Sequence, residues 1–230
     1  LVLFMASFQD SEDIEIRIKK ISEWQVADDQ TGQGISLETT RGTIYTLLHN
    51  DPYEPTAKGV IWVSGASGGF DGPARKMYSI ISNALAPDIA SLRINYRFPG
   101  NLTECVMDTL SAVSFMAGIG HTDLVLVGHS FGGAVVIQAA QFSDLVKGVV
   151  GLSSQTQGAT GVAQITPRPI LLMHGEDDNV LSSDCSELIF KWANEPKEIV
   201  ILPSTGHSLE ETAPLVIQRV QSWVIDHLGE

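Results

Sequence analysis

Short continuous apolar runs alternate with amphipathic stretches over most of this chain, and no other feature constrains its fold so strongly. A run that is apolar on both faces suits a strand covered by helices on both sides, as in a parallel sheet. The stretches between the runs carry apolar residues at helical spacing. This alternation predicts an α/β fold with a mostly parallel central sheet flanked by helices. The predicted strands cover residues 59–64, 89–94, 124–127, 148–152, 170–173 and 198–202, and the predicted helices cover residues 74–85, 104–117, 131–141, 183–193 and 211–228.

The first part of the chain follows a different pattern. Residues 14–19 alternate isoleucine with charged side chains, and this period of two indicates a half-buried strand. Residues 35–40 and 43–49 predict a hairpin that turns at Arg41 and Gly42. Strands joined by a tight hairpin are antiparallel. We therefore expect antiparallel strands on the N-terminal side of the parallel sheet.

The length of the chain, 230 residues, fits one domain. No repeat, low-complexity tract or linker divides it, so we expect a loose N-terminal segment at residues 1–12 and a single domain over residues 13–230. A chain of this length buries about 70% of its unfolded surface, so its core needs no disulfide or metal to support it. The two cysteines, Cys105 and Cys185, are too few for a disulfide framework.

Charge and hydropathy exclude several classes of partner. With 14 basic and 27 acidic residues the formal net charge is −13, which repels nucleic acid and anionic membrane surfaces. No apolar run approaches the length of about 18 residues that a membrane-spanning helix needs. The opening run at residues 1–4 is too short for the core of a signal peptide. We expect a cytoplasmic protein, a monomer or homodimer, whose partner is a small molecule.

The strongest chemical signal is the segment Gly-His-Ser-Phe-Gly-Gly at residues 128–133. It directly follows one predicted strand and leads into a predicted helix, which is the setting of a G-x-S-x-G nucleophile elbow. In such a turn the serine backbone is strained. The glycines of the motif are needed near it because a Cβ atom there would clash, and the serine hydroxyl points out at the carboxyl edge of the sheet. Ser130 is therefore the candidate nucleophile. The alternative is that Ser130 merely fills a tight turn between strand and helix.

A serine hydroxyl is a weak nucleophile and needs a base that is itself held by an acid. His207 lies in a Ser-Thr-Gly-His-Ser loop between the last predicted strand and the last predicted helix, and this position makes it the candidate base. The alternative is an ordinary solvated loop histidine. His129 is next to Ser130 in sequence, so its side chain should diverge from the hydroxyl, and we assign it to packing.

The acid should follow another strand, between the nucleophile and the base. Three carboxylates follow the predicted strand at residues 170–173, and each could instead be a solvated loop acid. We choose Asp178, because it stands four residues after His174 in an H-G-x-x-D run. Asp177 remains the second candidate.

With these motifs in the order Ser130, Asp178, His207, the chain resembles the α/β-hydrolase family over about residues 35–228. The resemblance is to its small serine-esterase and dienelactone-hydrolase-like branches, and it implies an α/β-hydrolase fold. In dienelactone hydrolases the nucleophile is cysteine, whereas this chain has serine. The resemblance therefore implies acyl transfer, but it does not extend to a dienelactone substrate.

The resemblance also implies an oxyanion hole. The segment Ser-Gly-Ala-Ser-Gly-Gly at residues 64–69 is similar to the oxyanion loop of the family, with Ser64 in place of the usual histidine. By this resemblance the backbone N–H groups of Ala66 and Phe131 would hold the oxyanion. A phosphate cradle is the alternative for such a loop, but Ser67 occupies the place where a G-x-G-x-x-G fingerprint needs its second glycine.

Two arginines stand at the end of the strand predicted at residues 89–94. Arg93 and Arg97 could recognise a substrate carboxylate through bidentate hydrogen bonds, or they could neutralise local acids. We favour neutralisation of local acids. No H-E-x-x-H motif and no cluster of Cys and His has the spacing of a metal site, so we expect neither a metal nor a cofactor.

These features together predict a serine hydrolase that cleaves small soluble carboxylic esters or thioesters through an acyl-enzyme intermediate. The alternatives are a serine peptidase of the prolyl-oligopeptidase-like type and a catalytically silent binding module with the same fold. Residues 153–169 are too few and too polar for a multi-helix lid. We therefore expect no large cap, and an open, shallow pocket formed mainly by the loops at residues 65–72 and 95–102.

Overall fold

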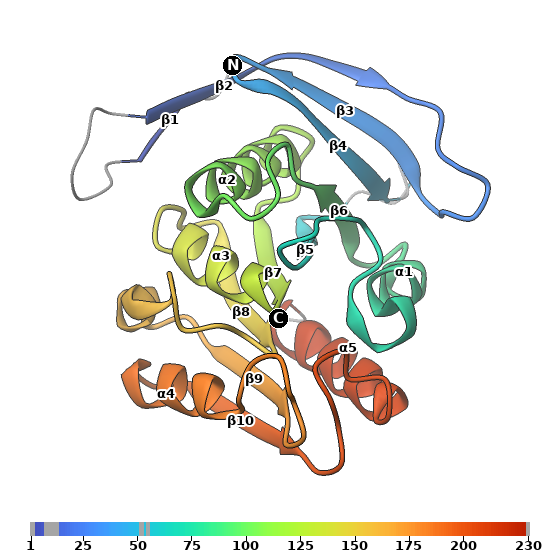
Figure 1. Cartoon of the computed structure of the whole chain (residues 1–230). Helices are drawn as coiled ribbons and strands as arrows, with labels where there is room; N and C mark the ends of the chain where they lie inside the picture. Colours follow the sequence, from blue (N-terminus) through green and yellow to red (C-terminus); the bar gives the residue numbers. More distant parts are fainter. Residues whose placement is uncertain (1–2, 7–13, 51–52, 54–55, 229–230) are drawn as a thin grey trace.

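The computed structural model describes residues 3–6, 14–50, 53 and 56–228 (Figure 1). Its strands form one ten-stranded sheet in the order β1-β2-β3-β4-β6-β5-β7-β8-β9-β10. The bounds of the strands are β1 (Leu3–Ala6), β2 (Ile14–Glu23), β3 (Gln33–Thr39), β4 (Gly42–His49), β5 (Lys58–Val63), β6 (Ala90–Asn95), β7 (Asp123–His129), β8 (Val146–Leu152), β9 (Ile170–Gly175) and β10 (Lys197–Leu202).

The sheet has an antiparallel and a parallel part. β1 to β4 pair antiparallel with one another, and β4 pairs antiparallel with β6. β5 to β10 pair in parallel. The prediction of a mostly parallel sheet with antiparallel strands on its N-terminal side is confirmed. Each end of the predicted strands in the parallel part lies within two residues of the observed one.

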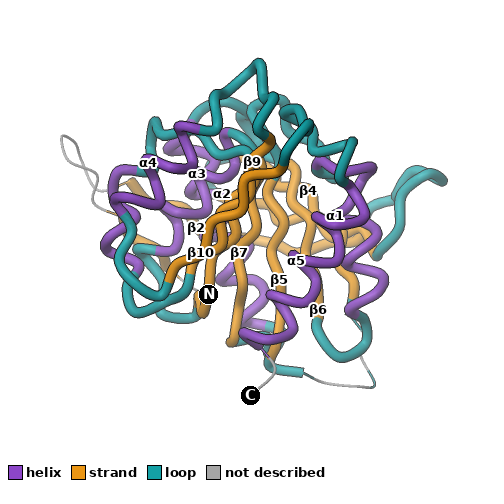
Figure 2. The backbone as a smooth tube through the Cα atoms, turned by 90° about the horizontal axis from the view of Figure 1, so that it is seen from below, coloured by secondary structure: helices purple, strands orange, loops and turns teal. Residues whose placement is uncertain are grey.

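Helices cover the parallel part of the sheet on both faces (Figures 1 and 2). Their bounds are α1 (Pro73–Leu85), α2 (Leu102–Gly118), α3 (Phe131–Ala140), the 3-10 helix η1 (Thr160–Ile165), α4 (Asp184–Trp192) and α5 (Ala213–Leu228). Helices α1 and α5 pack on one face, and α2, α3 and α4 pack on the other. The core therefore has two halves, one on each side of the sheet.

Strand β7 shows why the parallel strands are apolar throughout. Leu124 and Leu126 pack in the core half under α2 and α3, whereas Val125 and Val127 pack in the half under α1 and α5. Successive side chains of a strand point to opposite faces, so both faces must be apolar where both are covered.

The N-terminal segment departs from the prediction. Residues Leu3–Ala6 form β1, which pairs with β2 from Leu3 opposite Arg17 to Ala6 opposite Ile14. A run of four residues is too short for a period of two to be recognised, so the sequence indicates only a loose segment here. The rest of that segment, and the predicted domain boundary after residue 12, lie outside the described residues.

The strand order places a crevice at the carboxyl ends of β5 and β7. The chain passes from β5 to β6 on one side and later returns to β7 on the other side of β5. In open α/β sheets ligands bind where the strand order reverses in this way. The loop at residues 64–72 follows β5, and Ser130 follows β7, so both lie at this switch point.

The connection between β8 and β9 holds only the short helix η1, so this segment contains no multi-helix lid. This agrees with the expected absence of a large cap. Within the described ranges, no helix has both the length and the apolar character that crossing a bilayer requires.

Candidate active site

Ser130 stands on a sharp turn between β7 and α3. Its backbone angles, φ 58° and ψ −118°, lie in a region that non-glycine residues rarely occupy. A Cβ atom on Gly128 would collide with the backbone of Gly132, and a Cβ atom on Gly132 would collide with the carbonyl oxygen of Ser64. The N–H of Ser130 donates to the carbonyl oxygen of Leu152 at 2.7 Å. The glycines and this hydrogen bond hold the strained turn in place.

His207, in the loop after β10, lies between Ser130 and Asp178. Its Nε2 is 3.1 Å from Ser130 Oγ, and its Nδ1 is 2.6 Å from Asp178 Oδ2. The fold thus brings together the three side chains that the sequence singles out, each from a loop at the carboxyl edge of the sheet. Such a chain of hydrogen bonds can draw the proton from a serine hydroxyl toward an imidazole.

The Asp178 carboxylate is buried and accepts hydrogen bonds on both oxygens. Its Oδ1 accepts from the backbone N–H groups of Val180 and Leu181 at 2.8 and 2.9 Å. Burial alone would raise the pKa of Asp178, but the hydrogen bonds from Leu181 and His207 outweigh it and hold the pKa below its ordinary value. The carboxylate is therefore ionised at neutral pH. The other candidate, Asp177, is exposed, and its backbone N–H donates to the carbonyl oxygen of Thr205.

His174 is a further member of this network, which the sequence analysis used only as a marker for Asp178. The ring is fully buried, and its Nε2 lies 3.0 Å from both Asp178 Oδ2 and the carbonyl oxygen of Leu181. Both partners are acceptors, so Nε2 carries the proton and donates to them. Nδ1 then accepts from the hydroxyl of Ser186 at 2.7 Å. The H-G-x-x-D run places His174 close to Asp178 in the sequence, but it does not indicate the hydrogen bond between them.

His129, beside Ser130 in sequence, points to the His207 loop. Its Nε2 donates to the carbonyl oxygen of His207 at 3.1 Å, and the two rings lie 4.9 Å apart between centroids. Burial lowers the pKa of His129 to about 4, so the ring is neutral at neutral pH. In this position it supports the backbone that carries His207.

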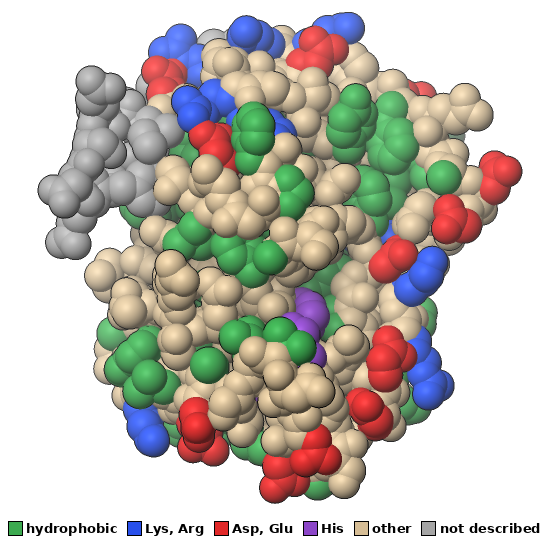
Figure 3. Space-filling view, viewed as in Figure 1, with side chains coloured by type: hydrophobic (Ala, Val, Ile, Leu, Met, Phe, Trp, Pro, Cys, Tyr) green, Lys and Arg blue, Asp and Glu red, His purple; other side chains and the backbone are tan. Residues whose placement is uncertain are grey.

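A pocket of about 480 Å³ opens beside Ser130. In Figure 3 histidine side chains lie in a hollow of this face among uncharged groups, and most charged side chains lie toward the periphery. The pocket is lined by Ser64, Gly65, Ala66, Ser67, Gly68, Gly69, Phe70, Asp71, Gly72, His129, Ser130 and His207. The loop at residues 65–72 thus supplies most of the wall, as expected. The loop at residues 95–102 does not line it, which corrects the prediction for that loop.

The loop after β5 is tied down by two hydrogen bonds. The hydroxyl of Ser64 donates to the carbonyl oxygen of Gly69 at 2.6 Å, and the N–H of Gly69 donates to Asn95 Oδ1 at 2.9 Å. Asn95 therefore supports this loop without lining the pocket itself. Of the two predicted oxyanion residues, Ala66 lines the pocket, whereas Phe131 follows Ser130 and begins α3, where an N–H has no partner within the helix.

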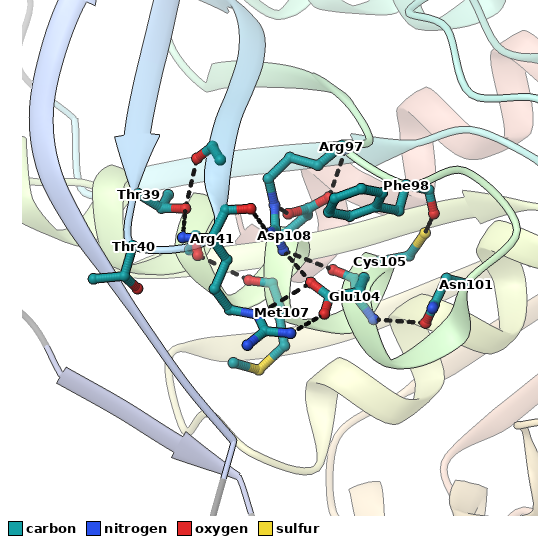
Figure 4. Close-up of polar contacts among 12 residues, drawn as sticks. Thr39, Thr40, Arg41, Arg97, Phe98, Asn101, Glu104, Cys105, Met107 and Asp108 are labelled. Carbon is teal, nitrogen blue, oxygen red and sulfur yellow. Dashed lines mark hydrogen bonds and ion pairs between the residues drawn. The ribbon is translucent and has the colours of Figure 1, made fainter.

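Neither arginine at the end of β6 faces the pocket. Arg97 forms ion pairs with Asp108 and Glu104, and its Nη1 donates to the carbonyl oxygen of Arg41 (Figure 4). Its side chain is 2% exposed, so it neutralises two local acids, as expected, and is closed to a substrate.

Arg93 is buried more deeply still. Its Nε donates to His49 Nε2 at 3.2 Å, and its Nη1 donates to Gln30 Oε1 at 3.0 Å and lies 3.7 Å from Asp71 Oδ1. The guanidinium thus stands behind the pocket and holds Asp71 from that side. Among the residues that the structure describes, no group of three His, Cys, Asp or Glu side chains is placed to hold a metal ion.

Comparisons with known proteins extend these observations. The family model described as Phospholipase/Carboxylesterase matches residues 101–223, which is more than half of the chain. Among curated proteins, the chain is 25% identical to the uncharacterized protein YfhR of Escherichia coli K12, over 44% of this chain and 44% of that protein. The match thus spans less than half the length of this curated relative.

Two solved structures share the fold. Est1E from Butyrivibrio proteoclasticus superposes with a TM-score of 0.74 at 16% identity, covering 87% of this chain and 100% of that one. Dienelactone hydrolase from Anabaena variabilis superposes with a TM-score of 0.71 at 16% identity, covering 90% and 99%.

At such identities the likeness shows the fold alone, and it confirms the predicted α/β-hydrolase fold. The family model adds more, because the segment it matches runs from the start of α2 into α5 and includes Ser130, Asp178 and His207. This chain therefore belongs to the Phospholipase/Carboxylesterase family.

Proposed function

We propose that this protein is a serine hydrolase that cleaves small soluble carboxylic esters or thioesters through an acyl-enzyme intermediate. One observation carries the proposal, the unbroken chain of hydrogen bonds from Ser130 Oγ through His207 to the buried carboxylate of Asp178. Membership of an esterase family supports the same reaction class.

In the first half of the reaction, Ser130 Oγ bonds to the carbonyl carbon of the substrate while His207 Nε2 takes the hydroxyl proton. The carbonyl electron pair moves onto oxygen, and Asp178 stabilises the imidazolium at Nδ1. When the tetrahedral intermediate collapses, the bond to the alcohol or thiol breaks, and His207 returns the proton to that leaving group. In the second half, water attacks the acyl carbon while His207 takes a proton from it. The bond between the acyl carbon and Ser130 Oγ then breaks, and His207 returns the proton to Oγ as the carboxylic acid leaves.

The oxyanion that forms in both halves needs donors that are already in place. We assign this role to the backbone N–H groups of Ala66 and Phe131, because one lies in the loop that lines the pocket and the other begins α3. The positive end of the α3 dipole adds to the stabilisation. Loss of one such donor costs about 10²–10³ in kcat in enzymes of this kind.

The open pocket favours small substrates. Its walls come from the loop after β5, the catalytic turn and His207. In the connection between β8 and β9, which could have carried a lid, η1 is the only helix. Each CH₂ group that enters a pocket contributes about 0.8 kcal/mol only while there is apolar wall to cover it. We therefore expect kcat/KM to rise over the first few carbons of the acyl chain and then to level off, without activation at a lipid interface.

The proposal is tested by labelling the purified protein with a fluorophosphonate probe, which reacts only with an activated serine. Ser130→Ala should abolish the labelling and the hydrolysis of ethyl butanoate. A panel of esters, thioesters and aminoacyl amides then assigns the bond type. Faster cleavage of the amides would indicate a peptidase instead, and a protein that neither reacts with the probe nor turns over any substrate would be a binding module.

A further inference from the structure

One end of the catalytic pocket is aromatic, and the proposed chemistry makes no use of it. Phe70 lines the pocket near the end of the loop after β5. Its ring stacks on the ring of Trp24, with 6.1 Å between the centroids and 20° between the planes. We propose that Phe70, backed by Trp24, forms a stacking subsite that selects esters carrying an uncharged aromatic group. This inference rests on the proposed function and names its substrate class.

The backing ring is fixed in place. Trp24 Nε1 donates to the carbonyl oxygen of Thr46 at 3.1 Å, and the rings of Trp24 and Tyr45 meet edge to face with 5.5 Å between the centroids and 78° between the planes. Aromatic pairs are favourable at centroid distances of about 4.5–7 Å in offset or edge-to-face arrangements, and both contacts fall in this range. Phe70 is therefore held from behind, and it is only half-buried, so a substrate ring can extend the stack.

Two glycines precede Phe70 in the pocket wall. Gly68 and Gly69 have φ angles of 72° and 95°, and no atom lies within 4 Å of the place that a Cβ atom on Gly69 would occupy. Peptide planes rather than side chains form this stretch of the wall. A planar group can lie along such a surface more closely than a puckered saturated ring of similar size.

The charges at this end explain why the aromatic group should be uncharged. Asp71, next to Phe70, is held by Gln30 Nε2 at 2.9 Å and lies 3.2 Å from Lys76 Nζ and 3.7 Å from Arg93 Nη1. Both cations are therefore already engaged by Asp71. A carboxylate on the substrate would meet the carboxylate of Asp71 at the wall, and the two cations beside it, Lys76 and Arg93, are already paired with Asp71.

Matched esters that differ only in one ring test the subsite. Ethyl 3-phenylpropanoate is compared with ethyl 3-cyclohexylpropanoate for a ring on the acyl side, and 2-phenylethyl butanoate with 2-cyclohexylethyl butanoate for a ring on the alcohol side. We expect the phenyl ester of at least one pair to have about a threefold to tenfold higher kcat/KM. Phe70→Leu should bring that ratio to about one, and Phe70→Tyr, which keeps the ring, should preserve it.

Phe98→Leu is the control. Phe98 is 52% exposed on the neighbouring loop and does not line the pocket, so this variant should keep the wild-type ratio. Equal kcat/KM values for phenyl and cyclohexyl esters in both pairs would overturn the subsite, and so would a phenyl preference that survives Phe70→Leu. In either case, hydrolysis of ethyl butanoate would still support the proposed function. Failure of the wild type to react with the fluorophosphonate probe or any ester would overturn both.

Discussion

The two sides of the catalytic pocket are built in different ways. On the side of Asp178, buried side chains hold one another, and the carboxylate accepts hydrogen bonds from two backbone N–H groups and two histidines. On the side of the loop at residues 64–72, the wall is largely backbone and glycine, tied down through Ser64 and Asn95. The first side tolerates little change in its side chains, because the buried carboxylate of Asp178 depends on this set of hydrogen-bond donors. The second side can change its side chains while the backbone donors remain.

The largest effect should come from the acid itself. Asp178→Asn keeps the size of the side chain but removes the charge that orients His207, and in a Ser-His-Asp triad this substitution lowers kcat by about 10⁴. Asp177→Asn, one residue away and exposed, is the matched control and should change kcat less than about twofold. Steady-state hydrolysis of ethyl butanoate measures both. A severe loss in Asp177→Asn alone would reverse the assignment.

His174 should have the next largest effect. It donates to Asp178 but does not line the pocket, so we regard it as a positioning residue. His174→Leu removes a buried hydrogen bond to a charged group, which is worth about 1.5–3 kcal/mol and corresponds to about a tenfold to hundredfold loss of kcat. KM should change little, and the acid limb of kcat/KM should move to higher pH, because Asp178 loses a donor to its ionised form.

His174→Gln, which keeps an N–H donor, should recover part of the activity and part of the pH profile. If His174→Leu lowers the melting temperature but leaves kcat and the pH profile of the folded fraction unchanged, the residue is merely structural.

The sequence predicts much of this contrast, for identifiable reasons. The G-x-S-x-G turn and the residues Asp178 and His207 could be located because each follows an apolar strand, and the carboxyl ends of parallel strands meet at one edge. The role of His174 could not be derived, because it depends on the tautomer that Leu181 and Ser186 impose across the fold. The role of Asn95, which supports the other loop without lining the pocket, also depends on a three-dimensional contact.

Alanine in place of a glycine should distinguish the two sides through stability. A Cβ atom on Gly132 would meet the backbone of Ser64, which has no room to move, so Gly132→Ala should cost about 1–3 kcal/mol or more of unfolding free energy. Gly69→Ala meets open space and pays only for its φ of 95°, about 1 kcal/mol. Urea unfolding measures both free energies. A greater loss in Gly69→Ala would show that the loop is the more tightly packed side.

The smallest effect concerns His49, the buried histidine behind the loop at residues 64–72. His49 accepts a hydrogen bond from Arg93, which in turn holds Asp71 in the pocket wall. Burial, together with the positive charge of Arg93, lowers the pKa of His49 to about 4. In the unfolded chain an ordinary histidine has a pKa of about 6.5. Between these values the unfolded state binds a proton that the folded state does not, so stability should fall as the pH falls from about 6.5 to 4.

His49→Gln keeps an acceptor for Arg93 but cannot take up the proton, so its stability should depend less on pH within this window. Urea midpoints at pH 7.5 and pH 5 measure the difference for the wild type and the variant. The wild type should lose more stability between the two pH values than His49→Gln does. Equal losses would mean that His49 is protonated in the folded protein at pH 5, despite its burial and the neighbouring charge of Arg93.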